Sequence, residues 1–396
     1  MTYKTKIGLL IPNMQSGGAE RVISITSQLF SEKGFEVYLI LFDTESISYQ
    51  YKGKLIDLKS KAGKTVISKV LKRITRIIKL SYYKYKYNLD FVISFLYSAN
   101  VVNYYSIGLA KKVLSCRGYG DYIENGEKYA KMMKKIDSFI VQTERMKADF
   151  VSHYNVNEAK INVINNPFDI SQIQEKAQES IDDNHQKFID THKTICTVGS
   201  FKKEKGYWHL LRAFSLVKES ISDAGLIFIG HGGDMEIKIK KMAESGKYRD
   251  DIFFLNYQQN PFRFISKCKL YICSSLYEGF PNALVEAMAC GTAVLSTDCK
   301  TGPRELLLKE ESNVERIKDI LYAEYGVLVP ELEEIVDLDI DNISSGEILM
   351  ADGIIKILSD EGLMQKYNES AKKRAANFSM ERYIENITNV IDKDFK

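Results

Sequence analysis

The stretch that decides the fold is Ser275-Leu-Tyr-Glu-Gly-Phe-Pro-Asn-Ala-Leu-Val-Glu-Ala-Met-Ala-Cys-Gly-Thr-Ala-Val294. The apolar run 270–274 predicts a buried strand, and the apolar run 283–289 predicts a helix. Glu278 is therefore expected in the intervening loop, and Glu286 about one turn into the helix. The first N–H groups of a helix lack partners within it and attract anions, helped by the helix dipole. The pattern predicts a diphosphate site at this helix start. Its members are Pro281 (which itself lacks an N–H), Asn282, Ala283 and Leu284.

The two glutamates of this stretch suit a ligand that carries hydroxyl groups. A carboxylate accepts hydrogen bonds well from neighbouring hydroxyls. We expect Glu286 to bind ribose hydroxyls and Glu278 to reach a transferred sugar. The alternative is an ordinary strand, loop and helix without a ligand.

Strand-like and helix-like segments alternate on both sides of this stretch. The strands predicted from apolar runs are 7–11, 37–42, 91–95, 112–115, 139–143, 194–198, 225–229, 252–255, 270–274 and 292–296. The segments 161–169 and 325–330 are also strand-like. Such alternation is typical of parallel sheets covered by helices on both faces. The polar segment 171–193 predicts a linker and a surface helix. A chain of 396 residues is thus expected to form two α/β domains, with a boundary around 168–192.

The stretch 275–294 resembles the E-x7-E motif of retaining GT-B-fold glycosyltransferases, the group 1 family of bacterial surface-polysaccharide type. The resemblance implies an α/β, GT-B fold, in which two Rossmann-like domains face each other across a cleft. It implies an acceptor-side domain over 1–168 and a nucleotide-sugar domain over 169–378. The terminal helix, 379–396, is expected to cross back to the N-terminal domain.

The segment Val198–Gly206 is expected to bind the donor diphosphate. The family usually has an Arg and a Lys here, and Lys205 matches the Lys. Breaking the bond to a phosphate requires positive charge, so Lys205 is a catalytic candidate; a solvated turn lysine is the alternative. Ser200 replaces the usual Arg, so that either Lys202 or Lys203 substitutes for it or donor binding is weaker.

Further donor-binding candidates follow from the resemblance. Gly17 and Gly18 come after the first strand and permit close backbone approach to a ligand, although a tight turn also requires glycine. His231 lies in a G-x-G turn near the donor, or is a plain exposed turn histidine. Tyr257 ends a strand where main-chain groups meet the base, and Phe280 shapes the loop around the sugar.

Many relatives place a histidine near the sugar and acceptor, after the fourth strand of the first domain. The segment 114–118 has no histidine there, and Arg117 is its strong polar candidate for catalysis. In retaining members no enzymatic base is firmly expected, because the leaving phosphate oxygen can take the proton of the acceptor.

Composition limits the partners. A net charge of +3 gives no reason to expect nucleic-acid binding. The six cysteines form no CxxC pair and no zinc spacing, and no Asp-x-Asp lies where a metal-dependent transferase needs one. We expect no metal and no cofactor beyond the nucleotide-sugar substrate. No signal peptide and no membrane-spanning run is predicted, which favours a cytoplasmic protein.

The charge is unevenly distributed. Segment 58–89 holds ten Lys or Arg and no acidic residue, with apolar residues at helical spacing and several tyrosines. Such a helix can lie on the anionic inner face of the cell membrane, or pack on the first domain, or both. Segment 331–341 holds six acidic residues and is expected to be a solvated surface segment.

These observations together predict a retaining glycosyltransferase (a hexosyltransferase). It would move a hexose or N-acetylhexosamine from a UDP-sugar to a lipid-linked saccharide in surface polysaccharide biosynthesis, such as capsule or O-antigen. The alternatives are a transferase with a soluble or protein acceptor, or a non-catalytic sugar-nucleotide-binding subunit. A UDP-sugar epimerase shares the fold but lacks this glutamate pair.

Overall fold

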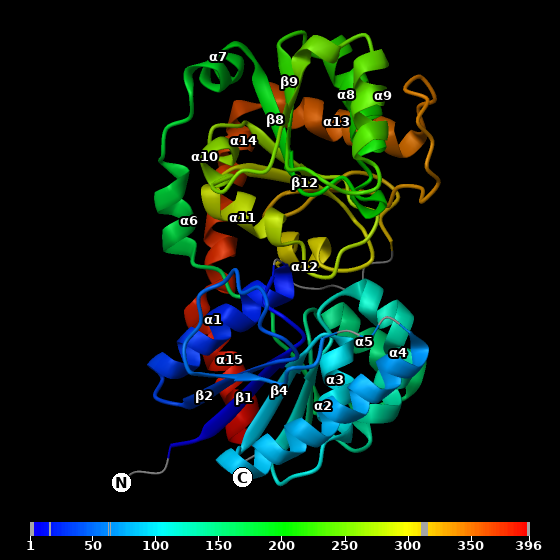
Figure 1. The fold of residues 1–396 in the computed structure, drawn as a ribbon. Coiled ribbons are helices and arrows are strands. Elements are labelled where there is room, and N and C mark those ends of the chain that lie inside the picture. Colours follow the sequence, from blue (N-terminus) through cyan, green and yellow to red (C-terminus); the bar gives the residue numbers. More distant parts are fainter. Residues whose placement is uncertain (1–3, 16, 62, 64, 310–315, 394–396) are drawn as a thin grey trace. The chain divides into compact units, whose positions relative to one another are not determined.

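The structure is a computed structural model that describes residues 4–15, 17–61, 63, 65–309 and 316–393. The chain forms two compact units (Figure 1). The N-terminal unit comprises Met1–Pro167 together with Met380–Lys396, and the C-terminal unit comprises Phe168–Ser379. The domain boundaries predicted from sequence were 168 and 378.

The N-terminal unit contains a parallel sheet in the order β3-β2-β1-β4-β5-β6-β7. Its strands are β1 Lys6–Ile11, β2 Glu36–Leu41, β3 Lys54–Asp57, β4 Phe91–Phe95, β5 Lys111–Ser115, β6 Ser138–Val141 and β7 Ile161–Val163. The central strands are apolar on both faces because helices cover both, as parallel sheets require.

Alternate residues of these strands meet different helices. One face packs on α1 (Gly18–Glu32) and α15 (Met380–Lys393). The other face packs on four helices, which are α2 Val66–Tyr87, α3 Tyr97–Tyr105, α4 Tyr119–Met133 and α5 Glu144–Tyr154. The last helix of the chain, α15, therefore completes the core of the N-terminal unit, and the hydroxyls of Thr26 and Tyr383 lie 2.7 Å apart inside that contact.

The C-terminal unit repeats this plan in the order β10-β9-β8-β11-β12-β14-β13. Its strands are β8 Lys193–Val198, β9 Ala224–Ile229, β10 Ile252–Leu255, β11 Leu270–Cys273, β12 Ala293–Thr297, β13 Leu321–Tyr322 and β14 Val327–Val329. All pairs are parallel except the edge pair β13–β14.

Helices cover both faces of this second sheet. One core contains α8 Tyr207–Ser220, α9 Glu236–Ser245 and α13 Ser345–Ser359. The other contains α6 Ile170–Ala177, α10 Phe262–Ile265, α11 Asn282–Cys290 and α12 Pro303–Leu307. Two further helices are α7 Asp183–Thr191 and α14 Glu361–Ala375. Short 3-10 turns lie at Glu158–Lys160, Lys203–Lys205, Arg249–Asp251 and Ala376–Phe378.

The ten strands predicted from apolar runs are confirmed, with ends shifted by at most two residues. The short strands β3 and β13 escape sequence reading because four or two residues give no clear periodicity. Segment 171–193 forms two helices, α6 and α7, where one was predicted.

The acidic segment 331–341 is more ordered than the predicted solvated segment. Arg212 Nε donates to the carbonyl of Asp339 at 2.8 Å, and His209 Nε2 lies 2.9 Å from the carbonyl oxygen of Glu333. The buried carboxylate of Glu347 binds both His209 and Arg212. The backbone of this segment therefore satisfies buried donors of α8, and the Asp337 carboxylate also lies 3.4 Å from Arg212. Its exposed acidic residues are Glu333, Glu334, Asp339 and Asp341.

Candidate active site

The carboxylate of Glu278 is held by two side chains in the C-terminal unit. Lys205 Nζ lies 2.7 Å from Glu278 Oε1, and Ser275 Oγ donates to the same oxygen at 2.7 Å. Lys205 follows β8 and Glu278 follows β11, which are neighbouring parallel strands. The carboxyl ends of parallel strands are where ligands bind in open α/β sheets, so the pair lies at the expected edge.

The charge of Lys205 depends on this contact. Burial opposes the charged amine, but the attraction and hydrogen bond of the Glu278 carboxylate, with smaller contributions from Tyr207 and Cys273, together outweigh it and raise the pKa of Lys205 above its ordinary value. Lys205 therefore stays protonated at neutral pH, as a residue that neutralises a phosphate must.

The loop that carries Lys205 is fixed to the loop after β11. Ser274 Oγ donates to the carbonyl of Lys205 at 2.8 Å, and the N–H of Leu276 donates to the carbonyl of Glu204 at 2.8 Å. Gly206 has φ of 58°, and a Cβ there would lie 2.4 Å from the Ser274 carbonyl oxygen. Only glycine allows this approach, which places Lys205 beside Glu278.

A third loop, after β12, closes on the same place. The hydroxyl of Thr301 donates to the main-chain carbonyl of Glu278. A Cβ on Gly302 would lie 2.4 Å from the ring of Pro281, so these backbones are in close contact. Arg304 binds the buried carboxylate of Asp298 through two nitrogens, which orients the loop.

Helix α11 begins at Asn282, directly after this loop, as the sequence predicts. Glu278 lies in the loop before it, and Glu286 lies about one turn into it, with 7% of its surface exposed. Leu284 was predicted to offer a free N–H to the diphosphate, and this is wrong. Its N–H already donates to the carbonyl of Pro281 at 3.0 Å. The first turn tightens in this way, so the N–H of Leu284 is used within the helix.

The turn after β9 packs on the loop after β8. A Cβ on Gly230 would lie 2.2 Å from the Gly199 carbonyl oxygen, so this glycine permits the close contact of the two loops. His231 and Tyr257 project from neighbouring loops as an exposed pair, with ring centroids 5.9 Å apart. Ser200 is half-buried in the same group of loops. The structure thus gathers these three candidates at the carboxyl ends of β8, β9 and β10.

The prediction that the side chain of Phe280 contacts the donor is corrected by the structure. Its ring is buried against Phe168 and Phe378, with centroids 6.3 Å and 5.6 Å away. Its apolar surface is used by the core of the C-terminal unit, so only the backbone of Phe280 remains for a donor. Sequence reading could not separate these roles, because the residue sits in the motif in either case.

In the N-terminal unit, Arg117 lies after β5 and donates to the side-chain oxygen of Asn166, which follows β7. Gln142, after β6, donates to the same oxygen at 2.9 Å. Burial lowers the pKa of the Arg117 guanidinium. Among the described residues, Arg117 Nε and Gln142 Oε1 have no hydrogen-bond partner. This cluster occupies the carboxyl edge of the N-terminal sheet.

Gly17 and Gly18 lie where predicted, because Gly17 follows β1 and precedes α1 and Gly18 is the first residue of α1. The N–H of Gly17 donates to the hydroxyl of Tyr49 at 3.4 Å. A Cβ on Gly17 would lie 2.4 Å from a carboxylate oxygen of Glu20, so Glu20 folds over the start of α1. A carboxylate there is stabilised by the helix dipole, which explains Glu20 without a ligand.

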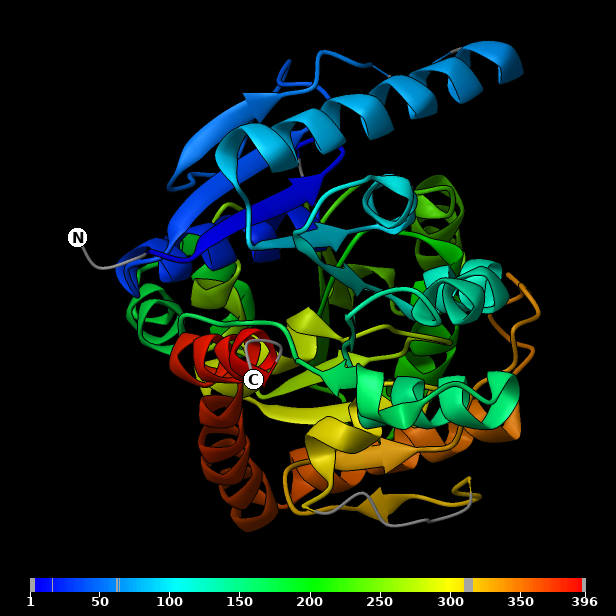
Figure 2. The ribbon, with the colours of Figure 1, turned by 90° about the horizontal axis from the view of Figure 1, so that it is seen from below.

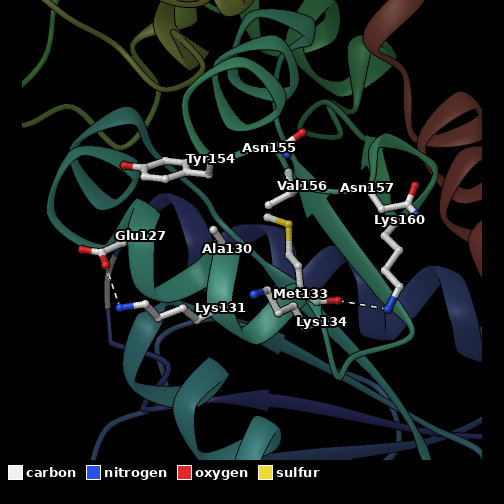
Figure 3. A pocket seen from close by; sticks show the side chains of 10 residues that line it. All are labelled: Glu127, Ala130, Lys131, Met133, Lys134, Tyr154, Asn155, Val156, Asn157 and Lys160. Carbon is white, nitrogen blue, oxygen red and sulfur yellow. Dashed lines mark hydrogen bonds and ion pairs between the residues drawn. The ribbon is translucent and has the colours of Figure 1, made fainter.

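A separate pocket of about 450 Å³ lies in the N-terminal unit (Figure 3). It is at the opposite edge of the sheet, because one of its residues, Lys160, directly precedes β7. Lys160 donates to the carbonyls of Met133 and Ile136, and Lys131 is paired with Glu127 at 2.6 Å. Its cations are thus largely satisfied, and it contains none of the candidate residues.

Three residues of the Glu278 site were not identified from sequence, namely Ser274, Ser275 and Thr301. Small hydroxyl residues in loops are common, so no local signal distinguishes these. Within the part of the chain that the structure describes, no group of three or more His, Cys, Asp or Glu side chains is placed to hold a metal ion.

Comparisons with known proteins agree with this geometry. Residues 178–318 match the family model described as Glycosyl transferases group 1. The chain is similar to an uncharacterized glycosyltransferase of Methanocaldococcus jannaschii, at 31% identity over 65% of this chain and 63% of that protein. It is also similar to N-acetylgalactosamine-N,N'-diacetylbacillosaminyl-diphospho-undecaprenol 4-alpha-N-acetylgalactosaminyltransferase of Campylobacter jejuni, at 27% identity over 94% of this chain and 95% of that protein.

A solved structure of Anabaena HepE in complex with UDP superposes with a TM-score of 0.75 at 16% identity, covering 98% of this chain and 100% of that one. Two Rossmann-like units and such matches define the GT-B fold of this protein. Its segment 178–318, which contains Glu278 and Lys205, is the part that matches the group 1 family.

Proposed function

We propose that this protein is a retaining glycosyltransferase that moves a hexose or N-acetylhexosamine from a UDP-sugar to a lipid-linked saccharide in surface polysaccharide biosynthesis. The observation that carries the proposal is the Lys205–Glu278 pair at the start of α11. The name of the Campylobacter relative specifies a diphospho-undecaprenol-linked acceptor, which supports a lipid-linked saccharide here. The UDP in the HepE structure supports the choice of nucleotide.

The chemistry follows from the charges of the site. The diphosphate binds at the first N–H groups of α11, where the helix dipole favours negative charge. Lys205 stabilises the charge that develops on the leaving phosphate oxygen as the bond to the sugar breaks. Glu278 then exchanges its contact with Lys205 for hydroxyls of the sugar, and Glu286 binds the ribose.

Lys205 and the start of α11 together supply the positive charge in this proposal, without a metal ion. Ser200 contributes no charge, so in this proposal Lys205 and the start of α11 bind the diphosphate. Exposed His231 and Tyr257 are the proposed contacts of the nucleotide. Gly17 and Gly18 are the proposed donor contacts of the N-terminal unit, and Arg117 is its proposed catalytic residue on the side of the acceptor.

The proposed location is the cytoplasmic face of the cell membrane, where a lipid-linked acceptor is accessible to a peripheral enzyme. Among the described residues, the helices include none that is long and apolar enough to cross a bilayer.

The test is a thermal-shift panel with UDP, GDP, ADP and common UDP-sugars. A ligand that binds only the folded state raises the melting temperature by mass action. We expect a shift with UDP and with one UDP-sugar, followed by transfer of that sugar to a lipid-linked saccharide acceptor. A shift with UDP but no turnover would favour a non-catalytic sugar-nucleotide-binding subunit, which the replacement of the usual Arg by Ser200 makes the second candidate.

A further inference from the structure

Helix α2 exposes a long apolar stripe. Val66, Ile67, Leu71 and Ile78 are 78%, 73%, 59% and 64% exposed, respectively. Val70, Ile74, Tyr82 and Tyr85 continue the stripe and are also exposed. These positions recur every three or four residues, so the side chains share one side of the helix. Exposing an apolar face of this length to water is unfavourable in free energy. Such a face marks a surface that interacts with a partner molecule or a membrane.

The stripe does not pack in the core of the N-terminal unit, because a different side of α2 packs there. Leu80 and Lys84 are buried, and Lys84 Nζ donates to the side-chain oxygen of Asn103 on α3 at 3.0 Å. Lys79 Nζ donates to the carbonyl of Leu58 at 2.6 Å, and Arg76 donates to the carbonyl of Ser60. These contacts fix the rotation of α2, which lies along the outside of the N-terminal unit (Figure 2), and the apolar stripe remains exposed.

A second exposed apolar segment lies beside the stripe. Ile107 and Leu109 are 80% and 102% exposed. They lie in the segment 105–109, here called the 105–109 loop, which starts at the last residue of α3 and leads to β5. The N–H of Ile107 donates to Ser81 Oγ at 2.8 Å, and Ser81 lies on α2 one turn from both Ile78 and Tyr85. The 105–109 loop is therefore attached to the stripe, and the two elements form one apolar surface.

The charge on α2 has one sign. Helix α2 carries seven Lys or Arg residues and no acidic residue over 66–87. Lys69, Arg73 and Lys86 are exposed. A basic helix with an apolar face and tyrosines near its end has the properties of helices that lie in the interface of anionic bilayers.

We propose that α2 and the 105–109 loop together bind an anionic lipid bilayer, with the apolar stripe, Ile107 and Leu109 inserted among the lipids and the exposed basic side chains on the headgroups. A second copy of the chain fits this surface less well, because pairing two α2 helices would bring their positive charges together. The inference does not rest on the proposed reaction, and it can be tested without a substrate.

The experiment is vesicle co-sedimentation of the full chain, with vesicles of phosphatidylcholine alone or of equal parts phosphatidylcholine and phosphatidylglycerol. We expect binding to the phosphatidylglycerol vesicles that weakens as salt is added, and little binding to phosphatidylcholine alone. The double variant Ile67→Ser with Leu71→Ser should lower the affinity by about tenfold or more. Ile107→Ser with Leu109→Ser should also lower it, which tests the second element.

The matched control is Ile237→Ser with Ile335→Ser in the C-terminal unit, where both side chains are 71% exposed. It should bind vesicles like the unchanged protein. The proposal is overturned if the unchanged protein ignores phosphatidylglycerol vesicles, or if the control loses as much affinity as the α2 variant. Light scattering that shows a dimer dissociated by Ile67→Ser with Leu71→Ser would assign the surface to self-association instead. Unchanged binding by the loop variant would overturn the role of the 105–109 loop.

Discussion

Each unit contains a largely buried lysine, and the surroundings of the two differ. Lys205 in the C-terminal unit lies 2.7 Å from the Glu278 carboxylate, which raises its pKa despite burial. Lys84 in the N-terminal unit donates to a neutral amide, that of Asn103, at 3.0 Å. Burial, together with the smaller effect of the nearby Lys112, lowers the pKa of Lys84 to about 7, against an opposing effect of Asp137.

The comparison shows that burial alone does not decide the charge of a lysine. A carboxylate partner keeps Lys205 protonated, whereas a neutral partner leaves desolvation as the dominant effect at Lys84. A buried cation with a pKa well above neutrality suits the stabilisation of a leaving phosphate. A buried lysine with a pKa near neutrality instead makes folding depend on pH.

The largest expected effect comes from removing the carboxylate that distinguishes the two sites. Glu278→Gln should lower turnover by about 10²–10³-fold. The sugar hydroxyls lose a negatively charged hydrogen-bond acceptor, and Lys205 loses the carboxylate that raises its pKa. The measurement is sugar transfer from the donor identified in the thermal-shift panel. Glu369→Gln, at an exposed position of α14, is the control and should retain full activity. Normal turnover of Glu278→Gln would remove Glu278 from the mechanism.

A smaller effect is expected from the pH dependence that Lys84 contributes. The unfolded state keeps the ordinary pKa of 10.5, whereas the folded state has a pKa of about 7. Between these values the unfolded state binds the extra proton, so stability rises with pH, and below about pH 7 the contribution is constant. From pH 7 to pH 9, the gain in unfolding free energy of the unchanged protein should exceed that of Lys84→Met by about 2 kcal/mol. Urea unfolding of both proteins at each pH measures this, and equal slopes would contradict the low pKa.

The smallest expected effect concerns the loop geometry that brings Lys205 to Glu278. Gly206→Ala places a methyl group 2.4 Å from the Ser274 carbonyl oxygen, at φ of 58°. Gly34 in the N-terminal unit also has positive φ, 89°, but a Cβ there meets nothing within 4 Å. Both substitutions strain the backbone because they place alanine at positive φ, but only Gly206→Ala also creates a close contact. Gly206→Ala should therefore lower the unfolding free energy by about 1 kcal/mol more than Gly34→Ala. Denaturant midpoints of the two variants measure this difference in unfolding free energy. Equal losses of stability would mean that the loop at Gly206 shifts to accommodate the methyl group without cost.

Much of the fold could be predicted because its signals are local. Apolar runs located the strands that were predicted, and Gly34 marks the end of α1 with positive φ, as a glycine after a helix does. The start of α11 and the place of Glu278 before it also came from the spacing of neighbouring residues. The two-residue strand β13 had no such signal, since it exists through its pairing with β14.

The candidate site was predictable only as a set of residues. The motif selects Phe280 and Leu284 together with Glu278, but the structure uses the ring of Phe280 for the core and the N–H of Leu284 for the first turn of α11. Likewise, Arg117 was chosen because its segment offers few polar residues, and its contact with Asn166 depends on the neighbouring strands β5, β6 and β7.

The sequence by itself determined the two alternating α/β halves and the motif that begins α11, because hydrophobic periodicity and helix-start chemistry act over a few residues. Only the tertiary structure decided which lysine meets a carboxylate. Lys205 and Glu278 are 73 positions apart, and they meet because β8 and β11 are adjacent and Gly206 allows their loops to touch. Lys84 instead contacts the neutral amide of Asn103, so this lysine, which is also largely buried, acquires the opposite pKa shift.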